Sequence, residues 1–164
     1  MSLRVGVLVV SDRAFRGLRP DAGGPRLSRV IVDRGWRLAH LEVVPDETGP
    51  IRDAITRWSD EGCDLIVTTG GTGLAPRDVT PEATRPLLEK ELPGVAEILR
   101  QESFKQTPLA ALSRGVAGLR GRSFIVNLPG NPSGAEWGLR ALLPLAPHVA
   151  ALAAGRDPHS HAHA

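Results

Sequence analysis

The chain has 164 residues, 41% of them hydrophobic, the size of one domain that buries about two thirds of the surface its unfolded form exposes. The net charge is only +2, basic residues are scattered among acidic ones, and aromatic residues make up 4%, with no tyrosine. This composition argues against a nucleic-acid-binding protein, which needs a contiguous basic face and usually aromatic platforms.

The cellular compartment is indicated by what the sequence lacks. A single cysteine, Cys63, cannot form an internal disulfide, so nothing points to an oxidising environment. No apolar run approaches the ~20 residues of a membrane-spanning helix, and the first expected strand begins at Leu3, which leaves no room for a targeting segment. We therefore expect a soluble cytoplasmic protein without a membrane segment.

Apolar patterns along the chain predict alternating strands and helices. Residues 3–11 form a short apolar run, typical of a strand buried on both faces. The expected strands are 3–11, 37–44, 64–69 and 123–128, and the expected helices are 25–34, one with the inner stripe Ile51, Ala54, Ile55 and Trp58, 80–91, 95–102 and 133–145. Residues 112–122 could hold a short strand or only a loop.

Glycine and proline mark the expected ends of helices. Gly35 and Gly62 follow the first two helices as C-terminal stops. The dipeptide Pro93-Gly94 is expected to separate helices 80–91 and 95–102, because proline lacks an N–H group and glycine is conformationally permissive. Pro144 and Pro147 are expected to kink or stop the last helix.

The alternation predicts an α/β fold in one domain. Strands that alternate with helices form a mostly parallel sheet with helices on both faces, which gives a three-layer α/β/α architecture. The expected domain covers residues 1–154. Residues 155–164 end in HSHAHA and are expected to be a disordered tail, because they contain no apolar anchor.

Polar or glycine-rich loops follow all four expected strands. Ligands bind beyond the carboxyl ends of the strands in an open parallel sheet. The loops are Ser11-Asp12-Arg13, Pro45-Asp46-Glu47, Gly70-Gly71-Thr72-Gly73 and Pro129-Gly130-Asn131-Pro132. We therefore expect the four loops to meet at one edge of the sheet.

The loop at residues 70–73 has two explanations. It lacks the lysine of a nucleotide-binding P-loop and the spacing of a Rossmann fingerprint. Its successive N–H groups can still wrap around an anion, because no Cβ atom obstructs them. Alternatively, the glycines only supply positive φ angles for a turn, and the loop alone does not decide between the two.

Two aspartates at strand exits favour the anion-binding explanation. A helix start needs Thr80 as its N-cap and Pro81 as its first residue, but it does not need Asp78. A carboxylate beside bound phosphate requires an intervening cation, and Mg²⁺ accepts one or two carboxylates together with phosphate oxygens. Asp46 is the second candidate, although an Asx-turn before the next helix would explain it equally well.

Histidine is scarce where catalysis would need it. Outside the tail only His40 and His148 occur, and neither follows an expected strand. The sequence therefore offers no suitable histidine for a Ser–His pair or a zinc site. Phosphoryl or nucleotidyl transfer remains possible, because an attacking phosphate is already anionic and catalysis can come from positioning and electrostatics.

Taken together, these motifs resemble the MogA/MoaB family of molybdenum-cofactor biosynthesis proteins. The matching segments are SDR at 11–13, VPDE at 44–47, TTGGTG at 68–73, RDVTPEAT at 77–84, ELPGVAE at 91–97, LSRGVAG at 112–118 and NLPGNP at 127–132. They cover nearly the whole chain in the family's order. The resemblance implies the family's α/β/α fold, a homotrimer and Mg²⁺-dependent adenylylation of molybdopterin by ATP, with release of pyrophosphate.

The resemblance also implies roles for individual residues. Asp46 and Asp78 correspond to two functionally essential aspartates and would hold Mg²⁺. Nucleotide phosphate would bind at Gly70, Gly71, Thr72 and Gly73, with Pro129, Gly130, Asn131 and Pro132 lining the same site. The pterin or its terminal phosphate would lie near Asp12, Ser113, Arg114 and Ser123. The product would pass to a molybdenum-insertion protein, and neither nucleic acid nor membrane is an expected partner.

Three alternatives to this enzyme remain open. The first is a catalytically inactive trimer of the MoaB type that binds a pterin or a nucleotide. The second is a hydrolase of nucleotide pyrophosphates that uses the same metal and loop. The third is an interaction domain that would tolerate replacement of Asp78 by asparagine.

Overall fold

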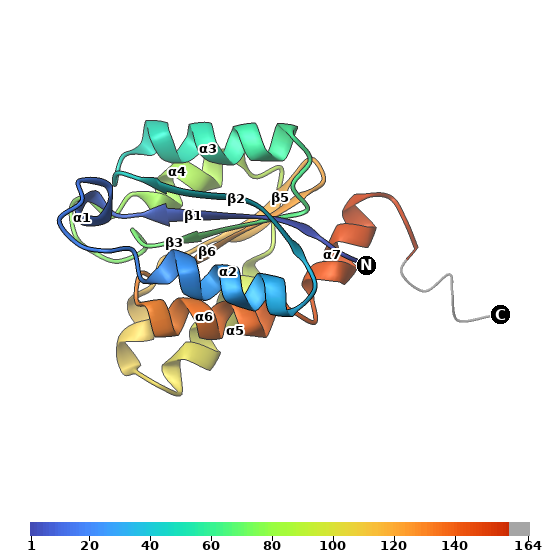
Figure 1. The fold of residues 1–164 in the computed structure, drawn as a ribbon. Coiled ribbons are helices and arrows are strands. Elements are labelled where there is room, and N and C mark those ends of the chain that lie inside the picture. The colour runs from blue at the N-terminus through green and yellow to red at the C-terminus, as the bar shows by residue number, and fades with distance from the viewer. Residues whose placement is uncertain (158–164) are drawn as a thin grey trace.

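Within residues 1–157, which the computed structural model describes, six strands form one sheet (Figure 1). They are β1 (Arg4–Val10), β2 (Arg37–Val44), β3 (Leu65–Thr69), β4 (Lys90–Glu91), β5 (Ala117–Arg120) and β6 (Ser123–Leu128), in the spatial order β2-β1-β3-β6-β5-β4. The pairs β1–β2, β1–β3 and β3–β6 are parallel, whereas β5 is antiparallel to both β6 and β4. The sheet is therefore mostly parallel, as expected.

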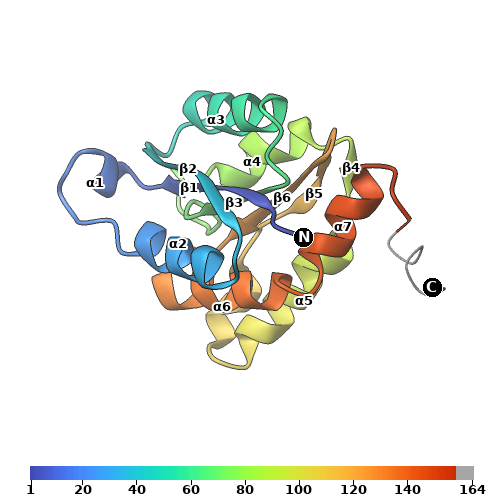
Figure 2. The ribbon, with the colours of Figure 1, turned by 45° about the vertical axis from the view of Figure 1, so that its right-hand side comes forward.

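Helices cover both faces of the sheet and confirm the three-layer α/β/α architecture. They are α1 (Asp12–Phe15), α2 (Gly23–Asp33), α3 (Thr48–Asp60), α4 (Thr80–Thr84), α5 (Pro93–Phe104), α6 (Pro132–Leu142) and α7 (Ala146–Ala153), with short 3₁₀ turns η1 (Arg85–Leu87) and η2 (Pro108–Leu112). Figures 1 and 2 show α3 and α4 on one face and α2, α5 and α6 on the other. None of the helices in residues 1–157 is both long and apolar enough to cross a lipid bilayer.

Side chains of the central strands alternate between two apolar cores. Val7 and Val9 of β1 pack in the core that contains α2 and α6, whereas Leu8 and Val10 face the core that contains α3. Successive side chains of a strand point to opposite faces, so a run that is buried on both faces reads as continuously apolar. Those buried strands fix the positions of the loops that follow their carboxyl ends.

Two details of the expected helices were wrong. The helix expected at 80–91 ends at Thr84, and Lys90 and Glu91 instead pair with β5. Pro93 does not break a helix but begins α5, because proline at the first position loses no hydrogen bond. The stop expected near Pro144 is confirmed, because α6 ends at Leu142 and a separate helix, α7, begins at Ala146.

The segment at 112–122 contains a strand, β5, and the four-residue helix α1 was not expected at all.

We keep residues 1–154 as the proposed domain, because both cores share one sheet. The expected tail begins at Gly155, and its residues 158–164 lie outside the described residues.

Candidate active site

The loops after β1, β2, β3 and β6 meet at the carboxyl edge of the sheet, as the strand order predicts. Two hollows of about 830 and 710 Å³ open there. The larger is lined by Asp12, Asp46, Gly70 and Pro132, among others, and the smaller by Thr72, Gly73, Ser113 and Pro129. Four residues line both hollows, namely Gly71, Asp78, Gly130 and Asn131. The two hollows therefore adjoin at the glycine loop.

Backbone geometry requires glycine at the first two positions of this loop. Gly70 has a φ of +104° and Gly71 a φ of +66°, which other residues rarely adopt. The loop is held by Thr80, whose hydroxyl donates to the Gly70 carbonyl at 2.9 Å and whose N–H donates to the Gly71 carbonyl at 3.0 Å. Thr80 therefore does not cap α4 as expected. It is the first helical residue and fixes the glycine loop instead.

The amides of the loop remain available for a ligand. Within residues 1–157, the N–H groups of Gly71, Thr72 and Gly73 donate to no protein acceptor, although the Gly71 and Thr72 carbonyls are both bonded. Asn131 caps the neighbouring helix α6 by accepting from Ser133 and Gly134. Free amides next to the N-terminus of a helix favour an anion.

Arg114 holds both arms of the glycine loop. Its guanidinium donates to the Gly73 carbonyl at 2.8 Å, to the Asp78 carbonyl at 2.8 Å and to the Glu82 carboxylate. The hydrogen bond from Arg114 lowers the pKa of Glu82. Arg114 lines neither hollow, and its guanidinium is used on the loop and on Glu82, so its expected role near the pterin or its terminal phosphate stays a prediction.

Asp46 points one carboxylate oxygen toward this loop. Its Oδ2 accepts from the Asp12 N–H at 2.8 Å, and a Cβ placed on Gly71 would lie 3.2 Å from its Oδ1. Burial raises the pKa of Asp46 above its ordinary value, and the carboxylates of Asp12 and Asp78 raise it further. These effects outweigh the Asp12 N–H and the nearby Arg77 guanidinium, both of which lower the pKa of Asp46.

Asp78 is anchored in the same manner. Its Oδ2 accepts from the Ala75 N–H at 2.9 Å and would lie 2.9 Å from a Cβ on Gly73. Among the described residues, no hydrogen bond reaches Oδ1 of either Asp46 or Asp78. One oxygen of each carboxylate is thus positioned by the backbone, and the other is free.

A magnesium ion fits this pair of carboxylates better than a metal held by protein alone. Residues 1–157 contain no group of three or more His, Cys, Asp or Glu side chains that could hold a metal ion. Mg²⁺, however, is usually bound by one or two carboxylates plus phosphate oxygens of the substrate. The repulsion between Asp46 and Asp78 is the physical reason to expect a cation when phosphate binds beside them.

Asp12 is occupied by protein partners. Arg77 donates to its carboxylate through Nε at 2.5 Å and through a terminal nitrogen at 3.0 Å, and the Asp46 N–H donates to Oδ1 at 3.0 Å. The hydrogen bond from Arg77 lowers the pKa of Asp12 from 3.8 to about 2. Asp12 and Asp46 therefore hold each other in place across two strand exits.

We expect the Asp12–Arg77 pair to make stability depend on pH in the acid range. A carboxyl group with a lowered folded-state pKa stabilises the fold above its unfolded pKa, and this contribution disappears as the pH falls through the folded pKa. The free energy of unfolding of the natural protein should therefore exceed that of Asp12→Asn by a constant amount above about pH 4, and the difference should shrink toward pH 2. Urea denaturation at a series of pH values measures it.

Arg77→Gln provides the matched comparison, because it removes the cation that lowers the Asp12 pKa. In the natural protein, Asp12→Asn should remove a clear pH dependence of the free energy of unfolding. In the Arg77→Gln background, the same Asp12→Asn replacement should remove much less of it. A difference between the natural protein and Asp12→Asn that stays constant down to pH 2 would contradict the assigned pair.

The two serines expected near the pterin lie in different places. Ser113 lines the smaller hollow, and its hydroxyl accepts from the Gly115 N–H at 3.3 Å. Ser123 does not belong to this edge, because it begins β6 rather than ending it. Its buried hydroxyl donates to the Cys63 carbonyl at 2.6 Å, next to the start of β3. The expectation for Ser123 is therefore corrected by its place in the strand.

Nothing in the sequence indicated which apolar side chains line the smaller hollow. Leu74, Leu109 and Trp137 come from three separate segments and line it with large exposed apolar groups. Exposed apolar residues cannot be distinguished from core residues by type alone. Arg77 was visible only as the neighbour of Asp78, and its partner Asp12 is 65 residues away.

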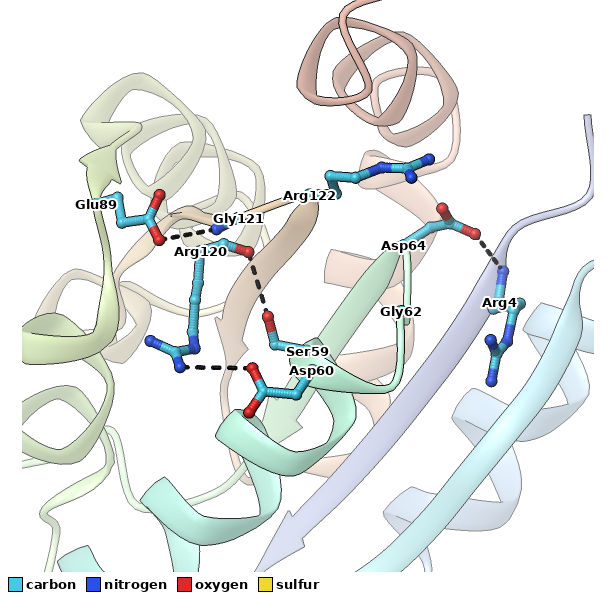
Figure 3. A pocket seen from close by; sticks show the side chains of 9 residues that line it. All are labelled: Arg4, Ser59, Asp60, Gly62, Asp64, Glu89, Arg120, Gly121 and Arg122. Carbon is cyan, nitrogen blue, oxygen red and sulfur yellow. Dashed lines mark hydrogen bonds and ion pairs between the residues drawn. The ribbon is translucent and has the colours of Figure 1, made fainter.

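A third hollow, of about 530 Å³, lies at the opposite end of the sheet (Figure 3). Its acidic groups are already paired, Asp64 with the Arg4 N–H, Asp60 with Arg120 and Glu89 with the Gly121 N–H. In Figure 3 the guanidinium groups of Arg4 and Arg120 point downward on opposite sides of the view and that of Arg122 extends to the right, so the three do not converge. We assign no site to it.

Comparison with known proteins identifies the family. A family model described as a probable molybdopterin binding domain matches residues 6–148. A molybdopterin adenylyltransferase of Helicobacter pylori strain J99 is 42% identical over 157 residues, which cover 94% of this chain and 89% of that protein.

Solved structures agree with this match. The molybdopterin biosynthesis enzyme MoaB of Thermus thermophilus is 52% identical with a TM-score of 0.88, over 94% of this chain and 98% of that one. The Mog protein of Mycobacterium ulcerans is 35% identical with a TM-score of 0.88, over 95% and 99%. With a family model that matches most of its length, this chain belongs to the MogA/MoaB family of molybdenum-cofactor biosynthesis proteins.

Proposed function

We propose that this protein is a molybdopterin adenylyltransferase, which transfers the adenylyl group of ATP to molybdopterin and releases pyrophosphate. The observation that carries the proposal is the meeting of two half-free carboxylates, Asp46 and Asp78, with three free amides where two hollows adjoin. A reaction between two substrates needs two binding regions that share a boundary. The names of the relatives, molybdopterin adenylyltransferase among them, support the same reaction.

In this proposal, an oxygen of the molybdopterin phosphate attacks the α-phosphorus of ATP. A new P–O bond forms, the bond from the α-phosphorus to its bridging oxygen breaks, and pyrophosphate leaves. No protein base is needed, because the attacking phosphate is already anionic. Catalysis then comes from holding the two phosphates close and in line.

The residues divide this work. The amides at residues 71–73 and the N-terminus of α6 bind phosphate oxygens, next to the loop at 129–132. Asp46 and Asp78 would hold Mg²⁺, which supplies neutralisation of the phosphate charge that gathers between them. Asp12 and Arg114 act by keeping the carboxylates and the loop in position.

The smaller hollow suits the pterin ring system. Leu74, Leu109 and Trp137 offer apolar surface to a flat bicyclic group, and Ser113 offers a hydroxyl. Most ligand sites combine such apolar surface with a few polar groups that fix orientation.

The test mixes purified protein with ATP, Mg²⁺ and molybdopterin and measures pyrophosphate and the adenylylated product. Both should form in equal amounts, and neither should form without molybdopterin. AMP release in the absence of molybdopterin would favour the hydrolase. No product above a heat-treated sample would leave only a binding protein.

We further propose that the chain assembles as a homotrimer in the cytoplasm and passes its product to a molybdenum-insertion protein. Support for assembly comes from two large apolar side chains exposed on α5, Ile98 and Phe104. Light scattering should give three times the chain mass, and the mass of one chain would contradict the trimer. Transfer is checked by mixing the loaded protein with an insertion protein and following the adenylylated product.

A further inference from the structure

The segment between β1 and α2 forms an arch, and most of its residues line the larger hollow. It contains the short helix α1, and Figure 1 places it at the end where the arrowheads of β1 and β3 point. Figure 2 shows the same segment projecting from the body of the protein. This arch, residues 11–22, carries three arginines at 13, 16 and 19.

Two of these arginines face the hollow without a protein partner. Arg13 and Arg19 both line it, and within residues 1–157 neither side chain forms a hydrogen bond or an ion pair. Arg77 and Arg114, by contrast, are engaged by carboxylates and carbonyls. Arg16 is exposed on the same arch but does not line the hollow.

Hydrogen bonds fix the base of the arch, so the backbone position of Arg13 is well defined. The Ser11 hydroxyl accepts from the Ala14 N–H at 3.2 Å, and Asp12 exchanges two hydrogen bonds with Asp46. Arg13 follows directly, so its backbone is tied to Asp46, one of the two carboxylates that would hold Mg²⁺. An arginine that starts from a fixed backbone loses less freedom when it binds.

The charges of the hollow favour an anion at these arginines. Of its four acidic residues, Asp12 is neutralised by Arg77, and Asp21 accepts from the Gly24 N–H. Asp46 and Asp78 lie on the glycine-loop side, where the metal is proposed. Arg13 and Arg19 are therefore the unpaired cations of the larger hollow, and guanidinium groups match phosphate geometry.

We propose that Arg13 and Arg19 bind a phosphate group of a substrate of this site. The proposal rests on the proposed function only for the identity of that substrate. The phosphate has two possible sources, the polyphosphate of ATP and the phosphate monoester of molybdopterin. Both are anions of the same chemistry, and separate measurements distinguish them.

The experiment compares Arg13→Gln and Arg19→Gln with two controls. Arg16→Gln removes a charge from the same arch, and Arg29→Gln removes one from the exposed side of α2, away from both hollows. Calorimetry gives the affinity for Mg²⁺–ATP, AMP and inorganic pyrophosphate, and the pyrophosphate-release assay gives the KM for molybdopterin. Circular dichroism checks that all four variants are folded.

We expect each of Arg13→Gln and Arg19→Gln to weaken binding of one phosphate ligand about 10-fold, and the controls to weaken it much less. Weaker binding of ATP and pyrophosphate with an unchanged molybdopterin KM assigns the arginines to the polyphosphate. A raised molybdopterin KM with unchanged ATP affinity assigns them to the monoester. In either case the difference from the natural protein should shrink at high salt.

Equal affinities and KM values in Arg13→Gln, Arg19→Gln and the controls would overturn the inference. Losses as large in Arg16→Gln would also overturn it, because they would report only the net charge of the arch. Pyrophosphate binding separates this inference from the proposed function. A protein that binds pyrophosphate through these arginines but never adenylylates molybdopterin would refute the function and keep the arginine site.

Discussion

Replacing Asp78 by asparagine is expected to lower the rate of pyrophosphate release by about 100-fold or more while leaving the fold intact. Asparagine is isosteric, and its side-chain oxygen can still accept from the Ala75 N–H, so the loop keeps its anchor. What disappears is the negative charge at the boundary of the two hollows. Removing one electrostatic group from a preorganised site usually lowers turnover by about 100- to 1000-fold, and we expect at least the lower value here.

The control for this variant is Asp53→Asn on α3. Asp53 is an exposed acid outside both hollows, so its replacement removes the same charge from the protein without touching the site. Turnover, urea denaturation and molecular mass are measured for both variants. Turnover of Asp78→Asn within a few-fold of Asp53→Asn would remove Asp78 from the mechanism.

Strands were predictable from their apolar residues, even where, as in the edge strand β2, most residues are only partly buried. Residues 37–44 were expected as a strand and form β2 with the same ends, and residues 123–128 form β6. The convergence of Asp46, Asp78 and the glycine loop also followed from the sequence, because carboxyl ends of parallel strands share an edge. Applied to Ser123, the same rule would have placed it at the other end of β6.

Contacts between distant segments were not predictable. Thr80 looked like a helix cap because residues of its type often cap helices, but its hydroxyl reaches back to Gly70. Pro93 looked like a helix breaker because the pattern does not show whether proline lies inside a helix or at its first turn. Arg114 had the residue type of a phosphate ligand, yet its guanidinium is used on loop carbonyls 36 and 41 residues away.

The glycine loop makes the two explanations left open by the sequence compatible. Positive φ angles at Gly70 and Gly71 are required by the turn itself, so glycine content alone is no sign of a ligand. The free amides at residues 71–73 are the separate observation that favours one. Structure and binding therefore make different demands on neighbouring residues of one loop, and substitutions should separate them.

Gly70→Ala is expected to lower the free energy of unfolding by about 3 kcal/mol, the second large effect. A left-handed backbone costs a residue with a Cβ about 1 to 2 kcal/mol, and overpacking adds a similar amount. The added Cβ at Gly70 would clash with the carbonyl oxygen of Val10, which is backbone of β1 and cannot rotate away. Relief requires the carboxyl ends of β1 and β3 to separate.

Gly35→Ala isolates the conformational part of this cost. Gly35 has a φ of +78°, but a Cβ there meets no atom within 4 Å, so its replacement should cost only about 1 kcal/mol. Urea denaturation of both variants at one protein concentration gives the difference. Equal losses would show that the Val10 contact is not decisive.

Unlike Gly70→Ala, Gly73→Ala should lower turnover strongly and the free energy of unfolding only slightly. Its φ lies outside the left-handed region, and the atom nearest to its added Cβ is Asp78 Oδ2 at 2.9 Å, the end of a side chain that can move. The fold can therefore accommodate the methyl group by displacing the carboxylate from the Ala75 N–H. If Gly73→Ala kept full turnover, the position of the Asp78 carboxylate would not matter for the reaction, and the central feature of the proposed site would have to be abandoned.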